Sequence, residues 1–265
     1  MTVTSGPIGI FDSGVGGLTV LKALRERMPG EQYIYLGDTA RLPYGTKTED
    51  TVRRYALNAA AHLNRHQVKL LVVACNTASS FALNEVAAAS PVPVVGVVQP
   101  GVRAALVTDA KRIGVIGTEG TIRSAAYQES LAQLGPAVEV RAVPCPLFVP
   151  LAEEGWGDHP VTDQVARHYL TPLLEWRAGA LILACTHYPL LRTSLRRVVG
   201  PDVHLVDSAS AVADTVASEH AELVDTSHGK EGDVHIQLTD ASDRFLRIAT
   251  AILGHKPDHI EVVDI

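Results

Sequence analysis

Short runs of apolar, often β-branched residues alternate along the chain with longer stretches whose apolar positions recur at helical spacing. Strands that are apolar without a break are buried on both faces, so this pattern predicts parallel sheets covered by helices, an α/β fold. The predicted strands are Ile8–Phe11, Tyr33–Leu36, Leu70–Ala74, Val92–Val95, Ile113–Ile116, Val138–Val143, Ala180–Ala184 and Val203–Val206. The clearest helical stretches are Leu18–Met28, Thr51–Arg65 and Thr162–Trp176.

Two parts of the chain repeat each other. Leu70–Thr77 and Ala180–His187 each combine an apolar strand, a cysteine and polar residues that open a helix, and their cysteines are 110 residues apart. Ile8–Gly14 resembles Ile113–Glu119 at a similar offset of 105 residues. We therefore expect two similar parallel-sheet lobes related by pseudo-symmetry.

The repeat also predicts how the chain divides. A Pro/Gly break at Gln99–Gly101 marks the first boundary, and the strand-like run Val234–Leu238 is expected to join the first lobe. The first lobe would then comprise residues 1–98 plus 208–265, and the second lobe residues 99–207. Ligands of parallel α/β sheets bind beyond the carboxyl ends of the strands, so the predicted site is the cleft between the lobes.

Composition narrows the class of protein. The chain has 265 residues, of which 46% are hydrophobic and 20% charged, which is typical of a packed globular enzyme. A net charge of −6 with scattered basic residues gives no indication of nucleic-acid binding. The apolar runs are strand-sized and no signal-peptide pattern stands out, so we expect no membrane contact. Three widely spaced cysteines form neither a disulfide framework nor a zinc motif, which favours a cytoplasmic protein with reduced thiols and no metal.

The two repeated cysteines are the strongest chemical signal. Cys75 and Cys185 each stand where a buried strand meets a helix N-terminus, a setting that stabilises a thiolate and attracts an anion. A single buried cysteine is more often a small core residue, but two in matching polar surroundings indicate a pair of acid/base thiols. Cys145 lies between two prolines and is expected to be structural.

The glycine-rich turn Asp12–Gly17 follows the first strand. Its G-x-G-G spacing differs from the GxGxxG dinucleotide fingerprint, so a nucleotide site is not favoured. Backbone N–H groups of the turn and the Ser13 hydroxyl are suited to a small carboxylate, with Asp12 taking an ammonium group or tuning a thiol. Helix capping alone would explain either side chain.

Further polar residues lie near other strand ends. After the second strand, Pro43 and Gly45 predict a turn that holds Tyr44, whose phenol is placed to close over a ligand. The alternative is a connecting turn in which Asp38 pairs with Arg41.

His187, two residues beyond Cys185, is placed to share the proton of the thiol. Most histidines in a protein have no such task. Glu153 and Glu154 look like a solvated helix end when taken alone.

Four stretches together resemble the signature sequences of the glutamate racemase family, cofactor-independent enzymes of bacterial cell-wall synthesis. The resemblance spans most of the chain and keeps the order of the motifs. The four stretches are Phe11–Val20, Asp38–Gly45, Ala74–Ser79 and Cys185–Leu190.

This resemblance implies that glutamate binds between two α/β lobes, with Cys75 and Cys185 as the two acid/base thiols. It implies that Asp12, Glu153 and His187 assist the thiols, although Glu154 leaves the register of the glutamate open. No cofactor is implied, the partner is the small molecule L- or D-glutamate, the product supplies peptidoglycan synthesis, and a homodimer is one option for the assembly. The implied substrate contacts are Asp12, Ser13, Pro43, Tyr44, Gly45, Asn76, Thr77, Thr118, Thr121, Thr186 and His187.

The chemistry agrees with this assignment, because inverting a stereocentre by proton transfer needs a base on one face of the α-carbon and an acid on the other. An ordinary thiol pKa of about 8.5 lies close enough to neutrality for both tasks.

Three alternatives remain at the level of sequence. They are a racemase for aspartate or another small acid, a hydrolase with a Cys–His pair, and a module that binds acidic ligands without turnover.

Overall fold

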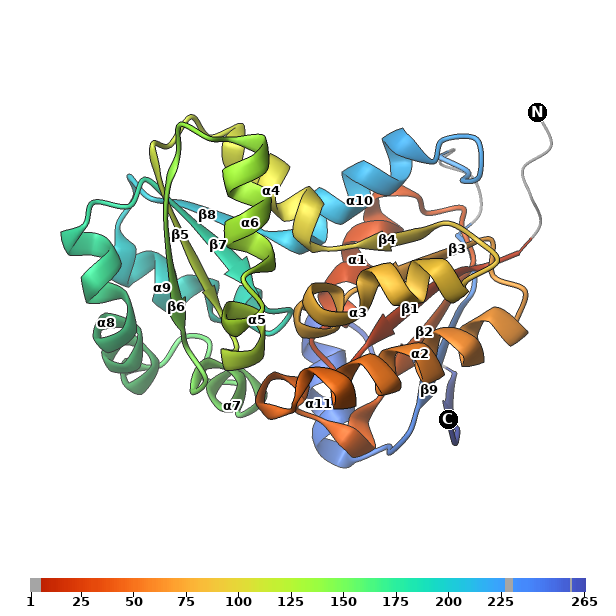
Figure 1. Ribbon diagram of the computed structural model, residues 1–265. Helices are drawn as coiled ribbons and strands as arrows, with labels where there is room; N and C mark the ends of the chain where they lie inside the picture. Colours follow the sequence, from red (N-terminus) through yellow and green to blue (C-terminus); the bar gives the residue numbers. More distant parts are fainter. Residues whose placement is uncertain (1–5, 227–230, 258) are drawn as a thin grey trace.

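The computed structural model describes residues 6–226, 231–257 and 259–265, and strands and helices alternate along them (Figure 1). Within these residues the strands form two separate parallel sheets. The first sheet has the order β10-β9-β2-β1-β3-β4 and the second has the order β6-β5-β7-β8. The strands of the first sheet are β1 (Ile8–Asp12), β2 (Tyr33–Gly37), β3 (Leu70–Val73), β4 (Val94–Gly96), β9 (Val234–Leu238) and β10 (Ile260–Val262). Those of the second are β5 (Arg112–Gly117), β6 (Glu139–Pro144), β7 (Ala180–Ala184) and β8 (His204–Asp207).

The two sheets repeat one topology. In each half the second strand in chain order lies beside the first, followed by the third and fourth, so that β2-β1-β3-β4 matches β6-β5-β7-β8. The repeat expected from the sequence is thus confirmed at the level of strand order. β9 and β10 extend the first sheet, as the late chain segment in Figure 1 also shows. The lobe boundaries at 98/99 and 207/208 stay a prediction.

Helices cover both faces of the sheets (Figure 1). The α-helices are α1 (Leu18–Arg27), α2 (Glu49–Arg65), α3 (Asn76–Ala89), α4 (Val98–Leu106), α5 (Glu119–Arg123), α6 (Ala126–Leu134), α7 (Phe148–Glu153), α8 (Pro160–Glu175), α9 (Arg192–Val199), α10 (Ser208–Glu219) and α11 (Asp243–Leu253). Short 3₁₀ helices are η1 (Thr39–Arg41), η2 (Tyr44–Thr46) and η3 (Tyr188–Leu191).

Alternating side chains of each central strand supply two cores. In the first sheet Ile10 and Val72 pack with α1, α10 and α11, whereas Phe11 and Val73 pack with α2 and α3 on the opposite face. Burial on both faces explains why these strands are apolar up to their carboxyl ends. In the described part of the chain, no helix is long and apolar enough to span a membrane.

β6 departs from the sequence expectation. The run Val138–Val143 was expected to be a strand buried on both faces, but β6 lies at the edge of its sheet and exposes alternate residues. An edge strand has one neighbour and thinner helix cover, so Glu139 and Arg141 reach solvent. The cysteines, in contrast, follow β3 and β7, each of which lies inside its sheet.

Candidate active site

Cys75 stands at the carboxyl end of β3 and caps the N-terminus of α3. The backbone N–H of Ala78 donates a hydrogen bond to Cys75 Sγ at 3.5 Å. Because β1 pairs with β3, the residue after β1 lies next to this thiol, and Cys75 Sγ donates to Ser13 Oγ at 3.5 Å. Cys75 is therefore surrounded by hydroxyl and backbone groups.

Cys185 stands at the corresponding end of β7, but its surroundings differ. Sγ lies 3.9 Å from Nδ1 of His187, and both residues are buried. The expectation of a helix directly after this cysteine is only partly met, because η3 (Tyr188–Leu191) is a four-residue 3₁₀ helix and α9 begins at Arg192. A 3₁₀ turn of this length aligns few peptide dipoles, so an imidazole takes the place that a helix N-terminus has beside Cys75.

His187 is the start of a chain of charged groups. Its Nε2 lies 3.3 Å from Oε1 of Glu153, in an ion-pair contact whose N–H direction does not meet hydrogen-bond geometry. Glu153 Oε2 lies 3.5 Å from the guanidinium of Arg244 in α11, which also binds Glu154 at 2.8 Å. The geometry thus settles which carboxylate faces His187. It is Glu153, while Glu154 is half exposed at the surface.

Asp12 lies at the end of β1 and is fully buried. Its Oδ2 accepts hydrogen bonds from the backbone N–H groups of Gly14 and Gly17, both at 3.0 Å, and its Oδ1 accepts one from Thr186 Oγ1 at 3.3 Å. Burial raises the pKa of this carboxyl, although His187 and the backbone donors act against the rise. Asp12 connects the glycine-rich turn of one half to the Cys185 loop of the other.

Burial also changes the acidity of the groups around the thiols. It raises the pKa of Cys75 to about 12, and Asp12 acts in the same direction. The thiolate that the helix N-terminus was expected to favour at Cys75 is therefore disfavoured, because desolvation exceeds the effect of the Ala78 donor. Burial works to lower the pKa of His187, but contacts with Cys185 and Glu153 prevail and raise it to about 10.

Three threonine hydroxyls join the two halves across the cleft. Thr77 Oγ1, at the start of α3, lies 3.0 Å from Thr118 Oγ1 and 3.1 Å from Thr121 Oγ1. Thr118 and Thr121, from the loop and helix after β5, lie 3.0 Å apart. These hydroxyls satisfy one another, so a ligand must replace bonds that are already formed.

Tyr44 is held by the protein in a way that the sequence left open. Its hydroxyl donates to Asp38 Oδ2 at 2.5 Å, and Thr239 Oγ1 donates to the other oxygen of Asp38 at 2.9 Å. Asp38 also pairs with Arg41 at 3.7 Å, as the connecting-turn alternative expected. The phenol of Tyr44 is therefore engaged by Asp38, and its ring lines the cleft without a free hydroxyl.

One cavity collects most of the candidate residues from both halves, and its volume is about 30 Å³. Asp12 and Thr121 lie just behind this lining and contact it through Thr186 and Thr77. No group of three or more His, Cys, Asp or Glu side chains with metal-binding geometry occurs in the described residues. The candidate residues that line the cavity are Ser13, Pro43, Tyr44, Gly45, Cys75, Asn76, Thr77, Thr118, Glu153, Cys185, Thr186 and His187.

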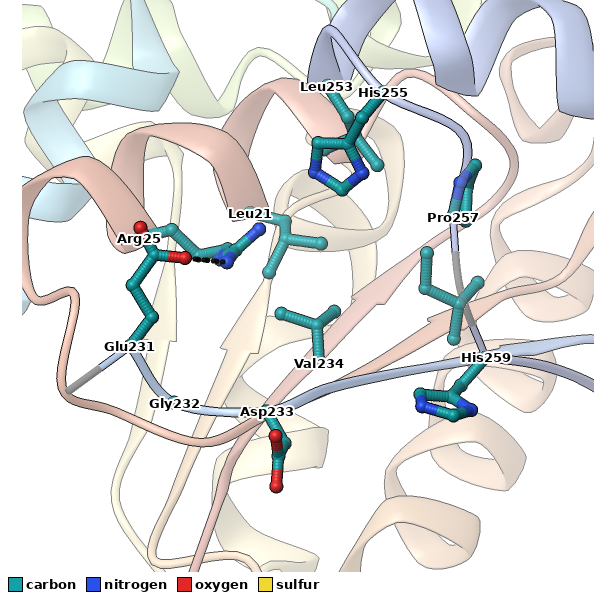
Figure 2. Close-up of a pocket in the computed structure, with 11 residues that line it drawn as sticks. Leu21, Arg25, Glu231, Gly232, Asp233, Val234, Leu253, His255, Pro257 and His259 are labelled. Atoms are coloured by element: carbon teal, nitrogen blue, oxygen red, sulfur yellow. Dashed lines mark hydrogen bonds and ion pairs between the residues drawn. The ribbon is translucent and has the colours of Figure 1, made fainter.

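A larger cavity, with a volume of about 260 Å³, lies elsewhere in the protein. Figure 2 shows the residues that line it. It is lined by Arg25, Asp233 and Val234 among others, and Arg25 pairs there with Glu231 at 3.3 Å. Val234 is the first residue of β9, so this cavity is at the amino ends of the strands, away from both cysteines. Ligand sites of parallel sheets lie at the other edge, and there the small cavity is the one that both cysteines line.

Comparison with known proteins decides the family. Residues 18–216 match the model of the Asp/Glu/hydantoin racemase family. The chain is 51% identical over 252 residues to the glutamate racemase of Geobacter metallireducens, covering 94% of this chain and 93% of that protein. The chain belongs to the glutamate racemases. Solved structures agree with this assignment.

Glutamate racemase from Francisella tularensis, solved in complex with D-glutamate, has a TM-score of 0.89 and 36% identity and covers 98% of this chain and 97% of that one. The glutamate racemase isoform RacE1 from Bacillus anthracis has a TM-score of 0.93 and 35% identity, with 98% of each chain covered. The two-lobe α/β architecture of the glutamate racemases is therefore the fold of this chain.

Two residues near the site gave no local signal in the sequence. Tyr127 of α6 donates a hydrogen bond from its hydroxyl to Asn76 Oδ1 at 2.6 Å, and Arg244 of α11 contacts Glu153. Both come from parts of the chain remote in sequence from the groups they touch. Only the tertiary arrangement of the glutamate racemase fold brings them to the cleft.

Proposed function

We propose that this chain interconverts L- and D-glutamate by proton transfer through two thiols. The observation that carries the proposal is that Cys75 and Cys185 line the same cavity from the two pseudo-symmetric halves of the protein. A base and an acid on opposite faces of the α-carbon are what stereochemical inversion requires. The identity to glutamate racemases over almost the whole chain supports glutamate rather than aspartate as the substrate.

The reaction exchanges one proton at each face. Starting from L-glutamate, the Cys185 thiolate takes the α-proton, and the Cys75 thiol gives its proton to the opposite face of the resulting carbanion. The product is D-glutamate, with Cys185 now a thiol and Cys75 a thiolate. This is the form that removes a proton from D-glutamate, so each turnover prepares the protein for the reverse direction.

Stabilisation of the carbanion depends on donors to the substrate carboxylate and on exclusion of water. The amide of Asn76 and the hydroxyls of Thr77 and Thr118 line the cavity and are proposed to supply these donors, whereas the hydroxyl proton of Thr186 is already donated to Asp12. A volume of about 30 Å³ holds a few water molecules at most and not glutamate. The cavity must therefore widen to admit the substrate and close again around it.

His187, Glu153 and Asp12 are proposed to assist the thiols. With a pKa raised to about 10, His187 is an imidazolium at neutral pH and stabilises the thiolate form of Cys185. Glu153 holds the ring from its other side. Asp12 positions Thr186 and the glycine-rich turn through the hydrogen bonds described above.

The setting of the activity follows from the same proposal. The three cysteines are free thiols, which fits a cytoplasmic enzyme that supplies D-glutamate for peptidoglycan. A homodimer stays a prediction, which sedimentation of the purified protein will test.

Deuterium incorporation tests the two-thiol mechanism. Turnover of L-glutamate in D₂O is expected to place solvent deuterium in D-glutamate while substrate recovered early stays protiated. Cys75→Ala and Cys185→Ala are each expected to abolish racemisation, since each direction needs both thiols. Near wild-type turnover by Cys185→Ala would contradict the mechanism, and faster turnover of L-aspartate than of L-glutamate would contradict the substrate.

A further inference from the structure

Asn76 carries a buried donor that the protein leaves unused. It is the first residue of α3, directly after Cys75, and it lines the cavity between the halves. Its Oδ1 accepts the hydrogen bond from Tyr127, while its Nδ2 is buried and has no hydrogen-bond partner. Buried amide groups in native proteins are almost always paired, so an unused donor in a cavity wall points to a ligand atom.

The direction of the amide depends on the phenol. Tyr127 is fully buried, and burial raises the pKa of its phenol. A hydrogen bond with the Ser208 hydroxyl lowers this pKa, but by less than burial raises it. The phenol therefore keeps its proton at any working pH and donates it. The oxygen of the Asn76 amide accepts, which leaves the NH₂ group at the opposite edge of the planar amide.

The hydrogen bond between Tyr127 and Asn76 also joins the two halves of the protein. Asn76 belongs to the half that contains β3, whereas α6 packs against α4 and β6 in the other half. Ala125, just before α6, has a φ of 60°, a left-handed conformation that residues with a side chain rarely adopt. Tyr127 is the second residue of α6, so this turn leads directly into the part of the helix that carries it.

We propose that Tyr127 is a positioning residue, which fixes the Asn76 amide so that its Nδ2 donates to a carboxylate oxygen of the bound amino acid. This inference rests on the proposed function. Tyr127 does not touch the substrate and acts only through Asn76. Loss of the Tyr127 hydroxyl frees the Asn76 amide to rotate. Its Nδ2 then points at the substrate carboxylate for only part of the time.

A double-mutant cycle tests this role. We expect Tyr127→Phe to lower kcat/KM for glutamate about 5- to 30-fold, mainly through a higher KM, as loss of one well-placed buried hydrogen bond does. In an Asn76→Ala background the same substitution is expected to change kcat/KM less than twofold, because the amide through which it acts is gone. Tyr33→Phe is the matched control, since Tyr33 is equally buried but donates to the backbone oxygens of Leu24 and Met28. It should lose thermal stability similarly and keep wild-type kcat/KM.

Additive effects of the two substitutions, or a Tyr127→Phe variant with wild-type kinetics, would overturn the proposal. A purely structural role of Tyr127 would show as lowered stability with equal losses in both backgrounds. Calorimetric binding of D-glutamate by the same proteins provides a second measurement of the cycle. If wild-type protein binds D-glutamate but does not racemise it, the proposed function fails. The double-mutant cycle measured by binding still tests the role of Tyr127 in that case. If wild-type protein does not bind glutamate, both fail.

Discussion

Nδ1 of His187 lies 3.9 Å from the thiol sulfur of Cys185, and both residues belong to the loop after β7. The equivalent position beside Cys75 is taken by the hydroxyl of Ser13. The strand order of the two halves is the same, but the groups that control the two thiols are different. Rates and pH dependence should therefore report on the Cys185 side and the Cys75 side separately.

Substitution of His187 tests the Cys185 side. Because contacts with Cys185 and Glu153 raise its pKa to about 10, the imidazole stays charged through the neutral range and loses its proton only above that pH. We expect kcat/KM of the wild type to fall as the pH passes about 10. His187→Asn should lower kcat/KM roughly 100-fold and remove that limb of the profile. Measurement of kcat/KM between about pH 6 and 11 decides, and a wild-type profile controlled by a group near the ordinary histidine pKa would contradict the charged form.

Alkylation tests the Cys75 side. With a pKa raised to about 12, the thiolate fraction of Cys75 is small at neutral pH and grows about tenfold per pH unit. Labelling by iodoacetamide is expected to follow that slope between about pH 7 and 10, with no plateau near the ordinary thiol pKa. Glutamate should slow labelling of Cys75, whereas Cys145, which is completely buried and lies outside the cavity, should stay unlabelled with or without glutamate. Mass mapping of the labelled peptides provides the readout, and an early plateau would show that the thiol is not desolvated.

Gly16 tests how closely the halves must approach. A Cβ at this position would lie 2.5 Å from Thr186 Oγ1 and 2.6 Å from His187 Nδ1, both in the other half. Gly16→Ala is expected to prop the cleft open and lower kcat/KM by about 100-fold, since an error near 1 Å in a site has that effect. Gly254→Ala is the control, because a Cβ there has no atom within 4 Å and the residue lies at the end of α11. This control should keep its activity and lose about 1–2 kcal/mol in the free energy of unfolding, because its φ of 83° is left-handed. Equal activity of both variants would mean that the halves do not close this far.

Arg244 tests the link from α11 to Glu153. Burial works to raise the pKa of Glu153, but His187 and then Arg244 hold it below its ordinary value. Glu154, Glu119 and Asp240 are the other charged groups around the guanidinium. In Arg244→Gln the acidic limb of kcat/KM is expected to move to higher pH by a few tenths of a unit, a size set by the partial exposure of Arg244.

Arg244→Lys, which keeps the charge, should move the limb less. High salt should shift the wild-type limb in the direction of Arg244→Gln because it screens this pair. Overlapping pH profiles for the wild type and both variants would show that Arg244 does not act on Glu153.

Much of the fold was predictable from local sequence. Central parallel strands such as β3 and β7 are apolar on both faces, so their positions can be recognised from the sequence alone. The edge strand β6 differs from the expectation, although Glu139 and Arg141 alternate with apolar residues in Val138–Val143, which is the pattern of a half-exposed strand. The short η3 was mistaken for the start of a longer helix, since Pro189 suits the first turn of either kind.

The candidate site was predictable where its residues follow strands and not where tertiary contacts decide. Cys75 and Cys185 could be found because the chain repeats their surroundings. Tyr127 is 51 residues from Asn76, and no local pattern links the two. The high pKa of Cys75 was also missed, because helix position is visible in a sequence whereas desolvation depends on what the rest of the chain places above the thiol.

The unlike neighbours of the two thiols have a thermodynamic consequence. L- and D-glutamate have the same free energy in water, so the equilibrium mixture is racemic whatever the protein contributes. Ser13 beside Cys75 and His187 beside Cys185 therefore cannot favour either enantiomer at equilibrium. They can only make the two proton-transfer steps differ in rate. The enzyme therefore spends different times in the form that binds L-glutamate and in the form that binds D-glutamate.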